Sequence, residues 1–347
     1  KNVFYEDRKL DNADVKTFQA ISDELGKDKK YIYRYDEKME VNPKDFQLYK
    51  NKDKIRYFRN NGKLYEAGTF LENTTVEDLD TFEILDDEYS KDKHNIYYGG
   101  VTLSDVDMDT FQIIMPNYYA KDKNSVYAGH KKIKGANPKT IKVLSQYYSK
   151  DDKNVFYNSD KILNADVNSF VVLEGDHSHA KDKNSVYYSG EKIEGANPKT
   201  FKIISDGMYS KDDKNVYAAR EIVKGADPQT FRRIPETNYA RDKNNLYYYF
   251  GDVKNLGKIN EKDFKVLDSN LIKNGNEVYY LGEKANIKNP EKFEPIKVSD
   301  DKHILYGKDD ENIYVVTSDE KYGYFKAIKN ADKDTFEVME NSDYSKD

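Results

Sequence analysis

The sequence contains no cysteine and no tryptophan, and it has few prolines for its 347 residues. Because no disulfide can form, packing and hydrogen bonds alone must hold the fold. No apolar run is long enough to cross a bilayer, so no membrane-spanning segment is expected. The net charge of −6 argues against sequence-independent nucleic-acid binding and against docking on anionic lipid, since both need a basic face.

Aromatic residues are abundant where these others are scarce. The mean hydropathy of −0.96 and the 35% of charged residues are typical of a disordered chain. The 31 tyrosines and 16 phenylalanines contradict that interpretation, because a disordered chain carries few aromatic residues. Burial must therefore come mainly from Tyr, Phe, Val and Ile, which favour β-strands.

The middle of the chain repeats itself. Residues 120–127 and 180–187 are identical, and residues 134–140 and 194–200 differ only at the first position. An aliphatic residue followed by an aromatic one recurs every 29 to 31 residues, at Ile96, Val126, Val155, Val186, Val216 and Leu246. Such self-similarity predicts a tandem array of about eleven units of roughly 30 residues.

A large apolar residue marks a second recurring position. It is found at Phe18, Phe46, Phe82, Phe111, Ile141, Phe170, Phe201, Phe231, Phe264, Phe293 and Phe336. Asp or Asn always lies four residues earlier, and proline often follows it, as in Asn137-Pro138. Asp or Asn followed by Pro is typical of a helix start, where the side chain caps free backbone N–H groups. Each unit is therefore expected to contain a short capped helical turn that ends at the apolar anchor.

The rest of each unit favours short strands. An apolar stretch follows the anchor, then the pattern Tyr-x-x-Asp, a Lys/Asn-rich turn, a Val-Tyr segment, a second turn and Lys-Ile. This order predicts strand, turn, strand, turn, strand and then the helical turn. The Asp of Tyr-x-x-Asp is expected to accept backbone N–H groups and hold the turn closed. The fold class is mostly β: an elongated or superhelical tandem-repeat array, with a β-propeller-like closed ring as the alternative.

Two resemblances follow from these motifs. The phrase Lys-Asp-Lys-Asn-x-Val-Tyr-Tyr, present at 181–188 and with one or two substitutions at 121–128 and 241–248, resembles the DKNYY family of bacterial repeat proteins. That family implies an often envelope-associated or secreted protein of unassigned function, and it supplies no site residues. Residues 89–250 match it best, which divides the chain into diverged repeats at 1–88, regular repeats at 89–250 and diverged repeats at 251–347. Residues 90–97 also resemble the Asp-box of sialidases in spacing.

Two groups of polar residues could hold a metal ion. His177 and His179 lie beside Asp176 and Asp182, but His179 occupies the position that is Tyr119 in another copy, which favours a structural role.

The second group is Asp105, Asp107 and Asp109, which begins like a calcium loop. It lacks the glycine and the closing glutamate of such a loop, and Asp107 is also the recurring cap. No catalytic motif is found either, so we expect no catalytic, cofactor-binding or metal-binding residues and no cofactor.

The second tyrosine of the Val-Tyr-Tyr segment varies between copies. It is Tyr98, Tyr157, Tyr188, Tyr248 and Tyr280 in some copies but Ala128, Ala218 and Gly307 in others. Two interpretations stay open: a surface ladder of aromatic rings that contacts a partner, or packing on the neighbouring copy. The five tyrosines are the candidate partner-contact residues.

The function expected from these features is that of a non-enzymatic binding or adhesion scaffold, bacterial and either secreted or at the cell surface, with a protein or glycan partner. One alternative is a structural spacer or fibre protomer that associates end to end, because the chain begins and stops at the same point of the repeat. A second alternative, prompted by the Asp-box resemblance, is a glycan hydrolase on a propeller-like ring.

Overall fold

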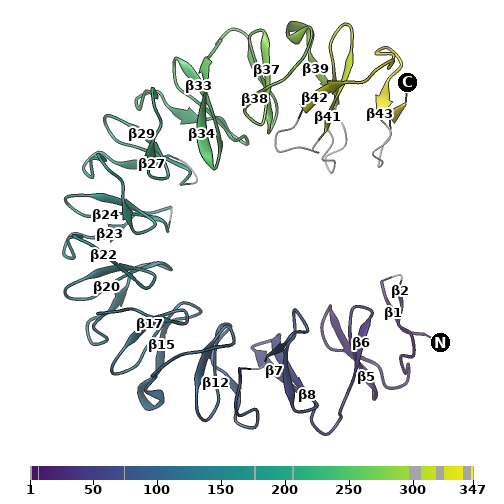
Figure 1. Ribbon diagram of the computed structural model, residues 1–347, viewed down its shortest axis with the longest axis vertical. Helices are drawn as coiled ribbons and strands as arrows, with labels where there is room; N and C mark the ends of the chain where they lie inside the picture. The colour runs from purple at the N-terminus through teal and green to yellow at the C-terminus, as the bar shows by residue number, and fades with distance from the viewer. Residues whose placement is uncertain are drawn as a thin grey trace. The chain divides into compact units, whose positions relative to one another are not determined.

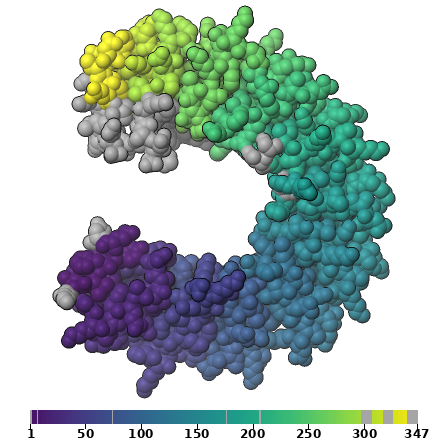
Figure 2. All heavy atoms as spheres, turned by 180° about the vertical axis from the view of Figure 1, so that it is seen from behind, coloured from purple at the N-terminus to yellow at the C-terminus, as the bar shows by residue number. Residues whose placement is uncertain are grey.

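The computed structural model describes residues 2–6, 8–73, 75–175, 177–204, 207–296, 306–317, 324–338 and 345–346, and these form short antiparallel strands joined by turns. The chain divides into two compact units, Lys1–Val172 and Leu173–Asp347. Within each unit the sheets follow one another in chain order (Figure 1). The space-filling view in Figure 2 shows the same order at the surface, where consecutive segments of a unit lie against each other.

The first unit contains one two-stranded sheet, five four-stranded sheets and a last short strand. The strands are β1 (Phe4–Tyr5), β2 (Arg8–Lys9), β3 (Gln19–Ala20), β4 (Leu25–Lys27), β5 (Tyr31–Arg34), β6 (Glu37–Glu40), β7 (Gln47–Asn51), β8 (Lys54–Asn60), β9 (Lys63–Glu66), β10 (Glu72–Asn73), β11 (Glu83–Ile84), β12 (Tyr89–Lys91), β13 (Ile96–Tyr98), β14 (Val101–Thr102), β15 (Gln112–Met115), β16 (Tyr119–Lys121), β17 (Val126–Ala128), β18 (Lys131–Lys132), β19 (Lys142–Val143), β20 (Tyr148–Lys150), β21 (Val155–Tyr157), β22 (Asp160–Ile162) and β23 (Val171–Val172).

The second unit begins with three strands that pair in order and continues with four four-stranded sheets and a two-stranded one. The strands are β24 (His179–Lys181), β25 (Val186–Tyr188), β26 (Glu191–Lys192), β27 (Lys202–Ile204), β28 (Tyr209–Lys211), β29 (Val216–Ala218), β30 (Glu221–Ile222), β31 (Arg232–Arg233), β32 (Tyr239–Arg241), β33 (Asn245–Phe250), β34 (Asp252–Lys258), β35 (Phe264–Asp268), β36 (Leu271–Asn274), β37 (Glu277–Tyr280), β38 (Glu283–Lys284), β39 (Glu294–Ile296), β40 (Tyr306–Lys308), β41 (Ile313–Thr317), β42 (Tyr324–Ala327), β43 (Glu337–Val338) and β44 (Ser345–Lys346).

Each complete repeat is a meander of four antiparallel strands, whereas the sequence predicted three. The extra strand is the Tyr-x-x segment itself, such as β16, which pairs Tyr119 with Ala128 and Lys121 with Val126. Its other edge pairs with β15, Gln112 opposite Lys121. A strand of three residues is too short to show the alternation by which strands are recognised in a sequence.

The helical turn is confirmed as a tight turn between one sheet and the next. It is a 3₁₀ helix at η1 (Met108–Thr110) and η2 (Pro290–Lys292) and a single hydrogen-bonded turn in other copies. In η1 the Asp107 carboxylate accepts the backbone N–H of Thr110, as expected of a cap. Asn289 makes no such bond at η2, where Pro290 removes one of the donors.

The core lies between neighbouring sheets. In the layer between sheets β11–β14 and β15–β18, Tyr89 and Ile96 of the first sheet pack against Ala120 and Tyr127 of the second, with the anchor Phe111 beside them. Side chains of a strand alternate between its two faces, so the aliphatic residue of Val-Tyr faces the following sheet and the tyrosine faces the preceding one. A sheet inside a unit therefore contributes to two thin core layers, as expected of a repeat protein.

A small residue recurs at one position of the second strand in most copies. It is the central residue of the second strand: Gly26, Ser90, Ala120, Ser149, Ala180, Ser210, Ala240 and Gly307. A Cβ atom added at Gly26 would lie 2.6 Å from Cζ of Phe18, and one at Gly307 would lie 2.3 Å from Cζ of Phe293. The anchor ring thus occupies the space that a larger side chain would need.

The predicted fold class, a mostly β tandem-repeat array, is confirmed. Among the described strands each sheet has two free edge strands, and no strand order closes on itself as a barrel would. The alternative of a closed ring and the division of the chain at 1–88, 89–250 and 251–347 stay predictions.

Candidate interaction surface

The strand order gives every repeat two chemically different ends. At one end lie the turn between the second and third strands and the helical turn that follows the fourth strand. We call this the Asp end, because the Asp of Tyr-x-x-Asp lies there. At the opposite end lie the turn between the first and second strands and the turn between the third and fourth strands. We call this the variable end.

At the Asp end, one carboxylate holds four groups together. Oδ1 of Asp122 accepts the backbone N–H groups of Asn124 and Ser125, both at 2.7 Å. Oδ2 accepts the hydroxyl of Tyr127 at 2.9 Å and the backbone N–H of Asp107 at 2.9 Å. The expected turn closure is thus confirmed. The bond to Asp107 was not predicted from the sequence. It joins the hairpin to the preceding helical turn.

The same arrangement recurs along the chain. The bond from the cap residue's N–H to the turn carboxylate joins Asp14 to Asp28, Asp78 to Asp92, Asn137 to Asp151, Asn197 to Asp212, Asp227 to Asp242 and Asn289 to Asp309. These carboxylates are buried despite their charge. Burial is tolerated because every bond is made to the ionised form.

The hydrogen bonds outweigh the burial in setting the pKa values. Burial alone raises the pKa of Asp122, but the N–H groups of Asp107, Asn124 and Ser125 and the Tyr127 hydroxyl stabilise the ionised form and hold the pKa below its usual value. The pKa is lowered in the same way at Asp28, Asp92, Asp212, Asp242 and Asp309.

The pKa values of the tyrosine hydroxyls shift in the opposite direction. At the corresponding position of the neighbouring repeat, burial and then the bond to Asp92 raise the pKa of Tyr97 to about 12. The shifts move the pKa values of Asp122 and Tyr97 away from neutral pH in opposite directions.

Two copies replace the turn Asp by Asn, which the sequence analysis missed. Asn60 and Asn274 still accept the N–H of the cap residue through Oδ1, Asn42 at 2.8 Å and Asn260 at 2.7 Å. Their amide groups donate to backbone carbonyls near the cap instead of binding the turn. The turns here are short: Asn60 pairs directly with Lys63, and the N–H of Gly62 donates to the carboxylate of Asp45 instead of to the side chain of residue 60.

At the variable end the copies have little in common. The turn after the third strand is Gly99-Gly100, Gly129-His130, Asn158-Ser159, Ser189-Gly190 and Ala219-Arg220 in successive copies. In this turn only the backbone is shared: positive φ angles recur there, and a hydrogen bond joins the two turns of this end, such as Gly129 N–H to the carbonyl of Tyr118. The turn between the first and second strands keeps one side-chain contact in several copies, where Ser22, Asp86 or Ser145 accepts the backbone N–H three residues later. The side chains displayed here are therefore free to differ without loss of the fold.

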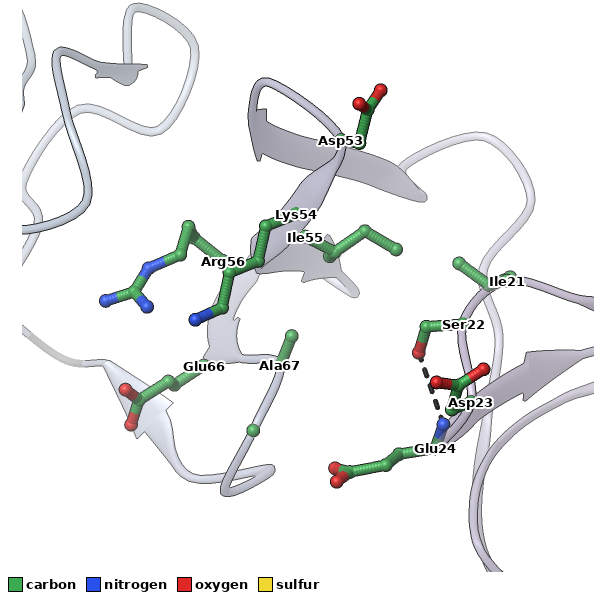
Figure 3. Close-up of a pocket in the computed structure, with 11 residues that line it drawn as sticks. Ile21, Ser22, Asp23, Glu24, Asp53, Lys54, Ile55, Arg56, Glu66 and Ala67 are labelled. Carbon is green, nitrogen blue, oxygen red and sulfur yellow. Dashed lines mark hydrogen bonds between the residues drawn. The ribbon is translucent and has the colours of Figure 1, made fainter.

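Pockets open at the variable end between neighbouring sheets. One of about 410 Å³ lies between sheets β3–β6 and β7–β10. In Figure 3, Ile21 and Ile55 face one another across it, and charged side chains such as Glu24 and Lys54 surround it. The Ser22 hydroxyl accepts the Glu24 N–H at 3.4 Å, which shapes one wall. This mixed lining suits a polar ligand or a protein surface better than an apolar small molecule.

The five candidate tyrosines also point toward the variable end, on the face of each sheet that meets the next one. Tyr98 packs edge-on against Tyr89, with ring centroids 5.0 Å apart, and lies close to Gly129 of the next copy. Tyr248 is buried and approaches Gly282 of the next copy. The other rings pack as Tyr157 on Tyr148, Tyr188 on His179 and Tyr280 on Phe325. Four of the five remain partly exposed, and their contact with a partner stays a prediction.

The polar groups considered for metal binding have other partners. His179 is buried at the tyrosine position against Tyr188 and Phe201, and Asp182 closes its own turn. Asp176 lies outside the described residues. Asp107 caps its helical turn and pairs with Lys123 at 2.5 Å. In the part of the chain that the structure describes, no cluster of three or more His, Asp or Glu side chains could hold a metal ion.

A series of small antiparallel sheets, each packed on the next through one layer of aromatic and aliphatic side chains, defines a β-rich tandem-repeat protein. The chain belongs to the DKNYY family, whose model matches residues 1–127, 89–208, 119–250 and 209–347. The resemblance drawn from the motifs is thereby confirmed. Neither the curated proteins nor the solved structures include a match to this chain. Over the described residues, no helix has the length and apolar character needed to span a bilayer.

Proposed function

We propose that this protein is a non-enzymatic scaffold of the bacterial cell surface, or a secreted one, which binds a protein or glycan partner through the variable ends of its repeats. The observation that carries the proposal is the separation of the two ends. The Asp end repeats the hydrogen bond from cap to turn from copy to copy, whereas the turn after the third strand, at the variable end, repeats only its backbone. A binding array needs this combination of a constant frame and changeable side chains.

The hydrogen bonds that the acidic residues make support a non-enzymatic role. A hydrolase that works through paired carboxylates needs one acid with a raised pKa and room for a substrate. The buried Asp residues of the Asp end have lowered pKa values and bind backbone N–H groups of their own repeat. Net charge is −6, which disfavours a nucleic-acid partner.

The proposal is tested by presenting the full chain to a glycan array and to extracts of host and envelope proteins. The affinity of the captured partner is then measured for the wild type and for two triple variants. One carries His130→Ala, Asp160→Ala and Arg220→Ala, which remove exposed side chains at the variable end. We expect it to bind at least about tenfold more weakly, since exposed binding residues are displayed there.

The matched control carries Lys93→Ala, Lys153→Ala and Lys214→Ala, three exposed residues of the Asp turns. It should bind as the wild type does. Equal loss in both variants, or no ligand from either screen, would contradict the proposal. Cleavage of a bound glycan during the assay would favour the hydrolase alternative. Protease treatment of intact bacterial cells checks the location, because a surface protein is degraded while a cytoplasmic marker survives.

A further inference from the structure

One hairpin at the variable end has longer strands than the hairpins of the regular copies. The third and fourth strands of a regular copy have three and two residues, as in β17 and β18, but β33 has six and β34 has seven. The run from Asn245 to Phe250 contains four consecutive aromatic residues, and Gly251 turns the chain with φ +73°. The hairpin therefore extends the sheet β31–β34 past the turns of other copies.

The tip of this hairpin carries an exposed aromatic ring. Phe250 is 78% exposed, the highest value among the large apolar residues that are exposed in the described chain. Its neighbours on β33 are covered: Tyr248 is buried and Tyr249 packs on Tyr209 with ring centroids 5.7 Å apart. A single exposed ring is common on protein surfaces, and it marks a contact surface only where other apolar groups lie beside it.

An apolar pocket lies directly beside the exposed ring. It has a volume of about 680 Å³ and is lined by Tyr248, Phe250 and Val253 of the hairpin and by Leu281 of the next repeat. Two charged groups at its rim pair with each other: Nζ of Lys254 donates to Oε1 of Glu283 at 2.7 Å. The carboxylate of Asp252, also at the rim, accepts the N–H of Val253 at 2.7 Å.

The side chains that line the pocket favour some classes of ligand over others. A sugar needs several polar groups aimed at its hydroxyls, whereas the walls nearest the ring, Tyr248, Val253 and Leu281, are mainly apolar. An apolar side chain needs only the ring and aliphatic walls. The pocket therefore suits an apolar side chain.

The protruding ring and the adjacent pocket complement each other. When two copies of the chain meet about a two-fold axis, each can place Phe250 in the pocket of the other, because a two-fold contact uses the same patch twice. The rim is complementary to itself as well, since the adjacent Lys254 and Glu283 present both signs of charge, and in a two-fold contact each charge can pair with the opposite one of the other copy. We propose that this protein pairs with a second copy of itself through the β33–β34 hairpin, with Phe250 inserted in the apolar pocket of Tyr248, Val253 and Leu281.

The pairing is tested on the full chain by sedimentation equilibrium from micromolar to near-millimolar concentration. We expect a dimer that forms with rising concentration, and a dissociation constant at least about tenfold higher in Phe250→Ser and in Leu281→Ser, since buried aromatic and aliphatic anchors dominate such contacts. The matched control is Leu163→Ser, which removes a side chain that is 74% exposed in another repeat and should dimerise as the wild type does. Circular dichroism verifies that each variant is folded.

The absence of native cysteine allows a second, geometric test. A single cysteine in Asp252→Cys lies near the proposed axis, so mild oxidation should give a covalent dimer, whereas Leu163→Cys should stay monomeric. A wild-type protein that is monomeric at the highest concentration would overturn the proposal. So would a dimer that all three serine variants form equally well, or equal cross-linking of both cysteine variants.

Discussion

Removal of a single turn carboxylate is expected to destabilise the array far more than its position in a surface turn suggests. In Asp122→Ala, two turn N–H groups lose a charged acceptor, and the Tyr127 hydroxyl and the Asp107 N–H lose the partner that they reach inside the repeat. A buried donor without an acceptor costs about 1–3 kcal/mol, and turn N–H groups are partly rescued by water. Two such donors and a loosened turn together give a loss of about 3–5 kcal/mol in the free energy of unfolding.

The assay is urea unfolding followed by far-ultraviolet circular dichroism, with the midpoint and slope compared between variants. Asp109→Ala is the control, because Asp109 is an exposed carboxylate of the preceding helical turn. It should shift the free energy of unfolding by less than about 0.5 kcal/mol. A loss below about 1 kcal/mol in Asp122→Ala, or equal losses in the two variants, would refute the reasoning that the carboxylate joins two parts of the repeat.

Two further predictions concern packing and pH. Gly26→Val should lower the free energy of unfolding by about 1–3 kcal/mol, because a Cβ at that position meets the ring of Phe18; the urea midpoint measures it, and an unchanged midpoint would show that the ring moves aside. Stability should also fall at both ends of the pH scale. The lowered pKa of carboxyls such as Asp92 and Asp242 makes their contribution complete above the unfolded value of about 4, and it is lost as pH falls through the folded value. The pKa of Tyr97, raised to about 12, makes its contribution complete below about pH 10 and lost as pH rises toward 12. Midpoints measured from pH 2 to pH 12 should form a plateau with two falling sides, and a constant midpoint below pH 4 would contradict the assignment of the carboxylates.

The repeat, the anchor and the turn carboxylate could be predicted from the sequence because each is a local pattern repeated many times. The cap at Asp107 follows from its place four residues before Phe111, and closure of the turn by Asp122 follows from known Asx-turn chemistry. Repetition also indicated which polar residues have a structural role, since His179 stands where other copies have tyrosine.

What the sequence could not supply depends on register between segments. The bond from the N–H of Asp107 to Asp122 joins residues 15 positions apart, and only the folded meander brings them together. The same holds for the small residue under the anchor ring, which looks arbitrary until the ring of Phe18 is seen over Gly26. The long β33–β34 hairpin was visible as an aromatic run, but its exposed tip and adjacent pocket depend on the next repeat.

The central claim is that the turn carboxylate of a repeat binds the N–H of the cap residue and so holds the repeat together. Hydrogen exchange at the cap residues, measured by NMR, tests this claim most directly. The backbone N–H groups of Asp78, Asp107 and Asp227 donate to the carboxylates of Asp92, Asp122 and Asp242. We predict that these three amides exchange slowly, and that Asp122→Ala accelerates exchange at Asp107 while Asp78 and Asp227 stay protected. Exchange at the rate of an unstructured peptide at all three amides in the wild type would contradict the account.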